Sequence, residues 1–296
     1  MNRTSATPVA METRVAGAEP PPMSRTRLVA SRVALVEDLR CPGVGTRVAP
    51  EDFSPDFQVC LPYRGTFVWQ VGGDDVVGDA NQVLFVAGGE AFRICQPVFG
   101  AYAELILTPD PMVLAELVGT DDARLRTHTL FRRRSRRAEP ALQLRLAMYL
   151  HAGRHGGLAG VAGEEATLDL LGAALGGQAS TSLPGPASRR LVSRTKEFLA
   201  AHLSRSLRLA DIARAVGSSP AHLTTVFRRV EGVPLHRYLT QLRLARALVE
   251  LPHSPDLTAL ALEVGFSSHS HFAASFRRAF GAPPSLVRDG VRPRPS

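Results

Sequence analysis

The spacing of hydrophobic residues changes along this chain of 296 residues and divides it into regions of different structure. From residue 28 to residue 108, short β-branched and aromatic runs such as FQVCLP, TFVWQV, QVLFVA and AELILT are separated by clusters of Gly, Pro, Asp and Asn. Short apolar runs between turn residues are typical of antiparallel strands. This region therefore predicts a small antiparallel β-barrel or jelly roll.

Residues 109–186 change to helical spacing. Apolar residues recur three and four apart in PMVLAELVG, in residues 140–152 and in EEATLDLLGAALGG, which predicts a helical connector. The arginine run within residues 132–137 is interpreted as a solvated face, with contact to DNA or to the barrel as the alternative. The segment STSLPGPASRR that follows has the composition of a linker.

The last third of the chain contains the same helix-turn-helix pattern twice. Residues 207–239 and 256–288 superpose with an offset of 48 up to a turn glycine and 49 beyond it. In each copy an alanine allows the second helix to cross closely, and a glycine allows the positive φ of a tight turn. The second helix follows a serine that can cap its first turn. The residues concerned are Ala213, Gly217 and Ser219 in the first copy, and Ala261, Gly265 and Ser267 or Ser268 in the second.

A longer helix is predicted between the two copies. Residues 234–251 carry an apolar stripe at helical spacing, formed by Leu235, Leu239, Leu242 and Ala245. At about 1.5 Å per residue this helix would be roughly 27 Å long. Such a length suits two recognition helices placed about one turn of B-DNA apart, roughly 34 Å, on one face of the duplex.

The basic charge of the chain is concentrated in the repeat region. Residues 188–296 contain 17 Lys and Arg against 7 Asp and Glu, whereas residues 1–187 contain 18 against 20. The whole-chain net charge of +8 therefore resides in the last third. Because attraction to phosphates supplies most non-specific DNA affinity, the repeat, its spacing and its charge together predict a DNA-binding domain joined to a domain of another kind.

These residues resemble the C-terminal domain of the AraC/XylS family of bacterial transcription regulators. The resemblance covers about 100 residues, Ala187 to Arg288, and its most specific part is VGFSSHSHFAASFRRAFGAPPSLVR in the second copy. It implies a regulator that reads two successive major grooves of double-stranded DNA, with RNA polymerase as a partner. The chain departs from the family at Thr225, where a basic residue is common.

The resemblance also assigns residues to DNA contacts. The groove-facing positions would be Ala221, Thr224 and Thr225 on the first reading helix, and His269, Ser270, His271 and Ala274, preceded by Ser267 and Ser268, on the second. The phosphate contacts would be Arg228, Arg277 and Arg278, with ordinary solvated charges as the alternative. Because short side chains dominate the reading positions, we expect few bidentate contacts to bases. Leu223, Phe227, Phe272 and Phe276 are expected in the core.

A weaker resemblance concerns the N-terminal region. Gly78 and Asp79 followed by QVLFVAGGEAFRI look like the second half of a cupin barrel, as found in sensory domains of AraC-like regulators. Residues 26–127 contain no histidine, and the position where a cupin would place one lies near Phe92. We therefore expect no metal, no cofactor and no catalytic residue, which disfavours the alternative of a cupin-like enzyme.

Two kinds of signal could control this domain. A small organic effector could bind among Phe67, Trp69, Phe85, Phe92 and Arg93, although aromatic residues at alternate strand positions are more often core. Alternatively Cys41, Cys60 and Cys95 could sense oxidants or a soft metal, although cysteine is also a small buried hydrophobe. An odd number of cysteines suits the reducing cytoplasm.

The expected fold class is a multidomain α+β protein. It comprises a tail at 1–26, a cupin-like β-barrel domain with helical connector at 27–180, a linker at 181–187, an all-α domain of two helix-turn-helix units joined by a long helix at 188–290, and a tail at 291–296. No apolar run reaches 18 residues, so we expect neither a signal peptide nor a membrane span. A homodimer would use Leu142, Leu146, Leu168 and Leu171, unless these residues pack on the barrel.

Overall fold

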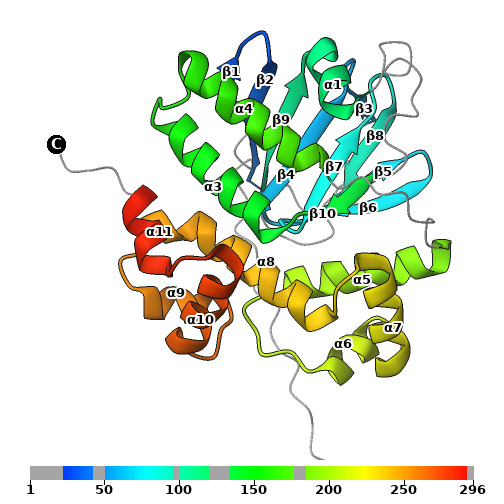
Figure 1. Cartoon of the computed structure of the whole chain (residues 1–296). Helices are drawn as coiled ribbons and strands as arrows, with labels where there is room; N and C mark the ends of the chain where they lie inside the picture. The colour runs from blue at the N-terminus through cyan, green and yellow to red at the C-terminus, as the bar shows by residue number, and fades with distance from the viewer. Residues whose placement is uncertain (1–22, 43–50, 96–100, 120–133, 177–184, 292–296) are drawn as a thin grey trace, which may run out of the picture.

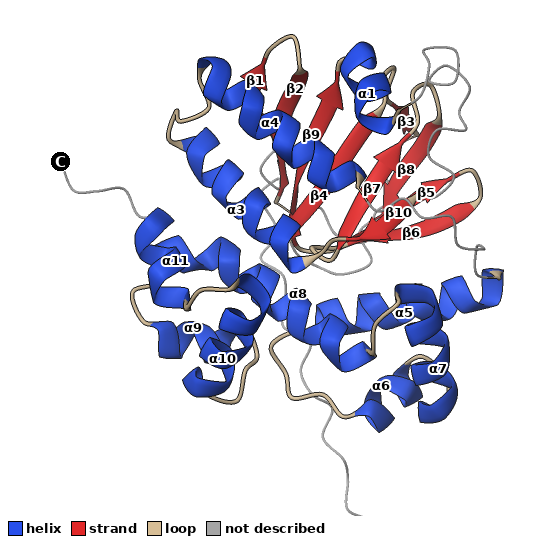
Figure 2. Ribbon diagram, in the orientation of Figure 1, coloured by secondary structure: helices blue, strands red, loops and turns tan. Residues whose placement is uncertain are grey.

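The computed structural model describes residues 23–42, 51–95, 101–119, 134–176 and 185–291 in two layers (Figure 1). β-Sheets and their covering helices form one layer, and a layer of helices built from the last third of the chain lies against it (Figure 2). The predicted N-terminal tail up to residue 22, the arginines at 132 and 133, and most of the predicted linker lie outside the described residues. None of the described helices has the length and apolar character needed to cross a bilayer.

The described strands form two antiparallel sheets. The six-stranded sheet has the order β1-β2-β9-β4-β7-β10 and the four-stranded sheet has the order β3-β8-β5-β6. The bounds of the larger sheet are β1 Ser24–Ala30, β2 Ala34–Cys41, β9 Tyr102–Pro109, β4 Gln58–Arg64, β7 Gln82–Val86 and β10 Ser135–Arg137. Those of the smaller sheet are β3 Asp52–Phe53, β8 Ala91–Cys95, β5 Phe67–Val71 and β6 Asp74–Gly78.

Three sequence predictions are corrected here. The sheets do not close into a barrel, because no described ladder joins the edge strands β1 and β10 to the edges of the smaller sheet. The segment predicted as a wholly helical connector contains β10, whose residues Ser135 to Arg137 pair with β7. Arg134 forms an ion pair with Glu90 of the sheet domain, and Arg136 donates to backbone carbonyls of α4. These two members of the arginine run therefore do not form a solvated face.

The central strands β9, β4 and β7 of the six-stranded sheet are buried on both faces. On β9, Tyr102 and Ile106 face the space between the two sheets, whereas Leu105 and Leu107 face the covering helices. Those helices are α1 Pro111–Val118, α3 Pro140–Arg154 and α4 Gly160–Leu175, which Figure 1 shows across the outer face of the sheet. Strands covered on two sides need apolar residues at every position, which explains their continuous hydrophobic runs.

The covering helices also account for the leucines assigned to a homodimer. Leu142, Leu146 and Leu171 are buried in the core between the helices and the sheet, and Leu168 is half-buried. Three of the four leucines therefore pack against the sheet of their own chain, which was the alternative to a dimer contact. Their burial removes them from any surface that a second copy could contact.

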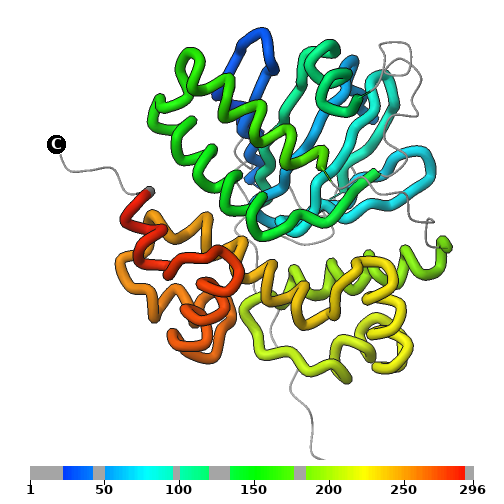
Figure 3. Tube along the Cα trace, viewed as in Figure 1, coloured from blue at the N-terminus to red at the C-terminus, as the bar shows by residue number. Residues whose placement is uncertain are grey.

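The last third of the chain folds as seven helices among the described residues. They are α5 Pro186–Ala201, α6 Leu209–Ala215, α7 Pro220–Glu231, α8 Leu235–Glu250, α9 Leu257–Glu263, α10 His269–Phe280 and α11 Pro284–Val291, with a short 3-10 turn Leu251–His253 after α8. One apolar core surrounds Phe227 and Tyr238 and a second surrounds Phe272 and Leu248. The tube in Figure 3 shows α8 running between the two halves, so the long helix predicted at 234–251 joins the two units.

One carboxyl group is buried between the two sheets. Glu104 on β9 is 4% exposed, and its strand neighbours are Leu39 on β2 and Pro62 on β4. Burial raises the pKa of Glu104 to about 7, and the charge of Arg25 opposes the rise only in part. A group that costs energy to ionise in the folded state links stability to pH.

We expect Glu104→Gln to stabilise the protein at pH 8. Between the ordinary pKa of 4.5 and the folded value of about 7, the folded chain holds a proton that the unfolded chain has released, so wild-type stability falls as pH rises through this window. The amide avoids this loss, and the gain should be about 3 kcal/mol at pH 8 and close to zero at pH 4. Urea unfolding at both pH values measures it, with Glu116→Gln on the exposed side of α1 as the control. An equal effect of Glu104→Gln at both pH values would contradict this account.

Candidate nucleic-acid interface

Two glycines shape the turns of the helix-turn-helix units. Gly217 precedes α7 with φ of 68° and Gly265 precedes α10 with φ of 97°, as the sequence predicted. A side chain at Gly265 would also lie 2.6 Å from the carbonyl oxygen of Leu203 and 2.8 Å from Nε of Arg243. The same Arg243 donates from Nε to the Leu203 oxygen at 2.9 Å. The turn of the second unit is therefore packed against the loop that precedes the first.

The two reading helices begin and end in the same way. The Ser219 hydroxyl accepts from the backbone N–H of His222 at 3.2 Å, and the Ser268 hydroxyl accepts from that of His271 at 3.2 Å. Both α7 and α10 have 12 residues and end at a glycine in the left-handed conformation. The predicted repeat is thus a repeat of caps and length as well as of sequence.

The buried side of each reading helix is apolar. Leu223 and Phe227 on α7, and Phe272 and Phe276 on α10, are completely buried, which confirms their assignment to the core. Helical periodicity then directs the remaining positions away from the core. The exposed side of each helix carries the residues that the family resemblance assigned to DNA.

On α7 the reading positions are small and locally bonded. Ala221 and Thr225 are exposed, and Thr224 is half-buried. The Thr225 hydroxyl donates to the Ala221 carbonyl oxygen at 2.9 Å, and the Thr224 hydroxyl donates to that of Pro220 at 3.1 Å. Because these hydroxyl protons are directed to the helix backbone, the threonine methyl groups are the parts most available to bases.

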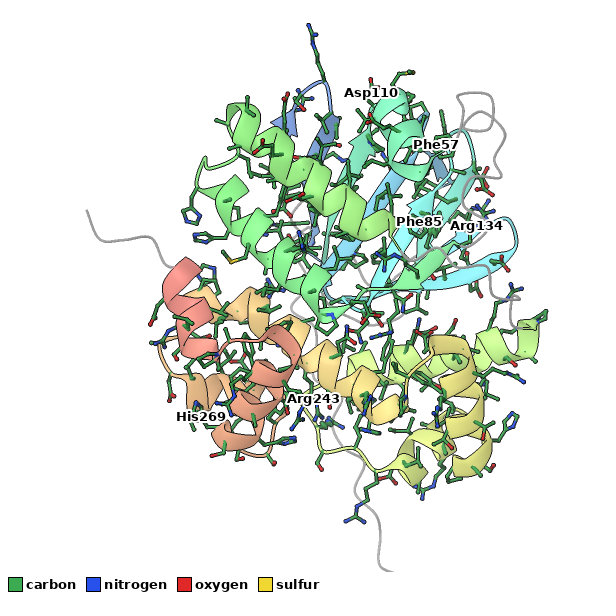
Figure 4. All side chains as sticks on the ribbon, in the orientation of Figure 1. Phe57, Phe85, Asp110, Arg134, Arg243 and His269 are labelled. Atoms are coloured by element: carbon green, nitrogen blue, oxygen red, sulfur yellow. The ribbon has the colours of Figure 1, made fainter. Side chains whose placement is uncertain are left out.

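On α10 the reading positions are more polar. The residues Ser267, Ser268, Ser270, His271 and Ala274 are exposed, and His269 is half-buried. The His271 ring lies 3.5 Å from the Ser267 hydroxyl through Nδ1 and edge-on to Phe266 with centroids 5.3 Å apart. These contacts hold the imidazole in one orientation at the start of the helix. Figure 4 shows His269 and Arg243 on the side of the molecule remote from the sheets.

The arginines that end the two helices differ in their partners. Arg228, Arg277 and Arg278 are exposed, and none of them has an ion pair with another described residue. Arg229 instead donates to the Ser188 hydroxyl at 2.9 Å and so contacts α5. Three guanidinium groups on the reading helices are therefore available for phosphate oxygens.

The structure adds one candidate that the sequence analysis omitted. His222 is exposed in the first turn of α7 and, by the repeat offset of 49, corresponds to His271 of α10. The repeat itself carried this signal, since a residue assigned to DNA in one unit has a matching histidine in the other. Each reading helix thus has a histidine three residues after its N-cap serine, His222 in α7 and His271 in α10.

The residues proposed for an effector do not all share one space. Phe67, Trp69 and Phe92 pack together between the two sheets, and Phe67 and Trp69 are at most 3% exposed. Phe85 belongs to the core under the covering helices, because alternate residues of β7 face opposite sides of the sheet. Arg93 does not join the aromatic residues either, because its side chain pairs with Glu51 at the surface.

Two of the three cysteines, Cys60 and Cys95, lie in settings that keep their thiols protonated. Cys41 and Cys60 are buried between the sheets and Cys95 is half-buried. Burial raises the pKa of Cys60 well above its ordinary value and also raises that of Cys95. A protonated thiol is a poor nucleophile and a poor metal ligand. Among the described residues no group of three His, Cys, Asp or Glu side chains could hold a metal ion.

A cavity of about 230 Å³ lies where the sheet domain meets the helical domain. Its walls include Tyr63, Arg64 and Thr66 from the sheet domain and Leu203, Leu242 and Arg246 from the helical domain. The cavity therefore combines apolar walls with two guanidinium groups and the carboxylate of Glu250. A small molecule bound there would contact both domains.

Comparison with known proteins identifies the helical domain. A family described as a helix-turn-helix domain matches residues 212–290. The regulator ExsA of Pseudomonas aeruginosa is 34% identical over 104 residues, which are 35% of this chain and 37% of ExsA. The activator AarP of Providencia stuartii is 33% identical over 99 residues, which are 33% of this chain and 73% of AarP. The match thus spans little more than a third of ExsA but most of AarP.

Two solved structures are also similar to this chain. An AraC-type transcriptional regulator from Chromobacterium violaceum is 28% identical, covers 36% of this chain and 96% of its own, and has a TM-score of 0.34. ToxT from Vibrio cholerae is 11% identical, covers 88% of this chain and 99% of its own, and has a TM-score of 0.35. With the identity to AarP over most of that protein and two identically capped reading helices, this chain belongs to the AraC/XylS family of transcription regulators.

Proposed function

We propose that this protein is a sequence-specific transcription regulator that places α7 and α10 in successive major grooves of one DNA duplex. The observation that carries the proposal is the pair of 12-residue helices with matching caps, each buried on one side and exposed on the side that bears its reading residues. The excess of 17 Lys and Arg over 7 Asp and Glu in residues 188–296 supports attraction to the duplex. As a regulator it would act in the cytoplasm and contact RNA polymerase.

The connection between the two units supports this arrangement. α8 runs without interruption from Leu235 to Glu250 and contributes buried residues to the cores of both units. At about 1.5 Å per residue it is roughly 24 Å long, which suits helices spaced by one turn of B-DNA. Continuous helical backbone between the units keeps that spacing nearly fixed.

We further propose that a small organic effector binds in the cavity between the domains. The space between the sheets is filled by side chains such as Phe67 and Trp69, whereas the cavity at the boundary has room for a ligand of several heavy atoms. A ligand that touches both domains and fits one of their arrangements better than another would shift the affinity for DNA. The guanidinium group of Arg246 favours a ligand with an anionic or strongly accepting group, whereas that of Arg64 lies 4.0 Å from the Glu250 carboxylate, which also lines the cavity.

Residues 185–296 alone should bind duplex DNA. The cores of both units are formed by helices within this fragment, and its net charge is positive. With about six phosphate contacts, the slope of log K against log salt concentration should be roughly −5. Fluorescence anisotropy with a labelled duplex at several salt concentrations measures this slope. A soluble, helical fragment that ignores DNA at low salt would contradict the proposal.

Phosphate and base contacts should respond differently to mutation. Arg277→Ala should weaken specific and random DNA alike, because phosphates carry no sequence information. His269→Ala should act mainly on the specific site, by about 1–3 kcal/mol if the imidazole meets a base edge. Titrations with a selected duplex and with random DNA give the two affinities, and Arg27→Ala on the exposed strand β1 controls for the loss of one charge. Equal losses on both DNAs for His269→Ala would show that this residue reads no base.

A further inference from the structure

A polar turn of the sheet domain is buried against the first helix-turn-helix unit. The turn joins β6 to β7 and consists of residues 79–81, followed by Gln82, the first residue of β7. Asp79 and Asn81 are completely buried and Gln82 is 3% exposed, although all three are polar. Ala80 between them packs against Leu242 and Ala245 of α8. Polar side chains are buried at this level only where partners satisfy them.

Tyr238 of α8 provides the first of these partners. Its hydroxyl donates to the Asp79 carboxyl oxygens at 2.7 and 2.9 Å, and its backbone carbonyl accepts from Nδ2 of Asn81 at 2.9 Å. Tyr238 is completely buried, and its ring meets Phe227 of α7 edge-on with centroids 5.3 Å apart. The turn is therefore connected through one side chain to the core of the first reading helix.

The last residue of α7 provides the second partner. Glu231 accepts from Nε2 of Gln82 at 3.1 Å and pairs with Lys196 of α5 at 2.7 Å. The side chains of Glu231 and Lys196 are each only 7% exposed. The sheet domain thus contacts the reading helix α7 at two places: at its C-terminal end through Glu231, and at its buried side through Tyr238.

The chemistry of this contact makes it selective for one orientation. Burial raises the pKa of the Asp79 carboxyl, while the charge of Lys196 and the Tyr238 hydroxyl oppose the rise. A buried polar network is favourable only when its hydrogen bonds are complete, so a rotation of α7 that breaks one bond leaves a buried group unsatisfied. Apolar surfaces would allow the same burial in several orientations.

The second unit meets the sheet domain in another way. Leu144 and Ala147 of α3 pack against the apolar core around Phe272 and Phe276. Hydrophobic contact is non-directional and tolerates small shifts. The reading residues Thr225, Arg228, His271 and Arg277 are exposed in this docked arrangement, so the sheet domain does not mask them.

We propose that Asp79, Gln82 and Tyr238 are positioning residues for DNA recognition that orient α7, so that the sheet domain controls the half-site read by the first unit and not that read by the second. The inference rests on the proposed DNA-binding function. It extends that function by assigning the control to one of two similar units. The docked turn pre-organises α7, and its loss lets α7 adopt orientations that fit the groove less well.

Gln82→Glu in the full chain tests the proposal from outside the DNA-binding domain. The new carboxyl group would face those of Asp79 and Glu231 and should undock the turn. We expect about tenfold weaker binding to a duplex selected from a random pool by the wild-type chain, the scale of one lost hydrogen bond to a charged group. Tyr238→Phe should have the same effect, since it removes only the hydroxyl that meets Asp79. Adding Glu231→Gln to Gln82→Glu should restore most of the affinity.

Binding to duplexes in which one half-site is scrambled distinguishes a loss of α7 positioning from a general loss of DNA binding. Footprints of Arg228→Ala and Arg277→Ala, one residue from each reading helix, assign the two halves. Gln82→Glu should have no effect once the first unit's half is scrambled, and its full effect when the other half is scrambled. Tyr149→Phe is the matched control, because it also removes a buried hydroxyl, one that lies 2.7 Å from the Thr167 hydroxyl within the sheet domain.

The outcomes distinguish this inference from the proposed function. A chain that selects no duplex would overturn DNA reading and the positioning role with it. If a duplex is selected, wild-type affinity of Gln82→Glu, equal loss on both half-scrambled duplexes, or a loss matched by Tyr149→Phe would overturn the positioning role alone. Tighter binding by Gln82→Glu would overturn it as well, because the docked turn would then restrain DNA binding.

Discussion

The arrangement of this protein depends on the burial of one helix, α8, on nearly every side. Leu235 and Tyr238 belong to the core of the first unit, and Leu244 and Leu248 belong to that of the second. Leu242 packs with Ala80 of the sheet domain. A helix packed against three neighbours in this way cannot turn about its axis without breaking one of the three contacts. The spacing of the two units and the docking of the sheet domain are therefore set by the same 16 residues.

This burial shows where sequence reasoning stops. The apolar stripe of Leu235, Leu239, Leu242 and Ala245 predicted the helix and one packed face, and the structure confirms both. Tyr238 and Gln241 lie off the stripe and have polar groups, and the helical spacing made no prediction for them. They are buried because partners far along the chain satisfy them: Gln241 donates to the carbonyl oxygen of Ala138 at 2.6 Å. Local spacing contains no information about such partners.

The rest of the fold shows the same difference between features set by local sequence and features set by distant partners. Turn glycines, N-cap serines and core phenylalanines were predictable, since each depends on backbone geometry within a few residues. The strands were predictable as elements, but β10 was missed because its three residues, Ser135 to Arg137, have no pattern of their own and form a strand by pairing with β7. Phe85 was grouped with Phe67 and Trp69 because an aromatic residue does not reveal which face of a doubly covered sheet it occupies. The exposed positions of α7 and α10 came from the family resemblance rather than from physical reasoning on single residues.

The cost of the polar interface bears on how the protein can respond to a ligand. An apolar contact between the domains would bury Ala80 and its neighbours at a lower desolvation cost than the present one, which also buries Asp79, Lys196 and Glu231. The free energy of the present polar contact is therefore close to zero, because its Coulomb and hydrogen-bond gains offset most of its desolvation cost. A nearly balanced interface can be shifted by a modest difference in ligand affinity, on the order of 1–3 kcal/mol. By linkage, any ligand that stabilises the docked turn must itself be bound more tightly in the presence of DNA that prefers the docked form.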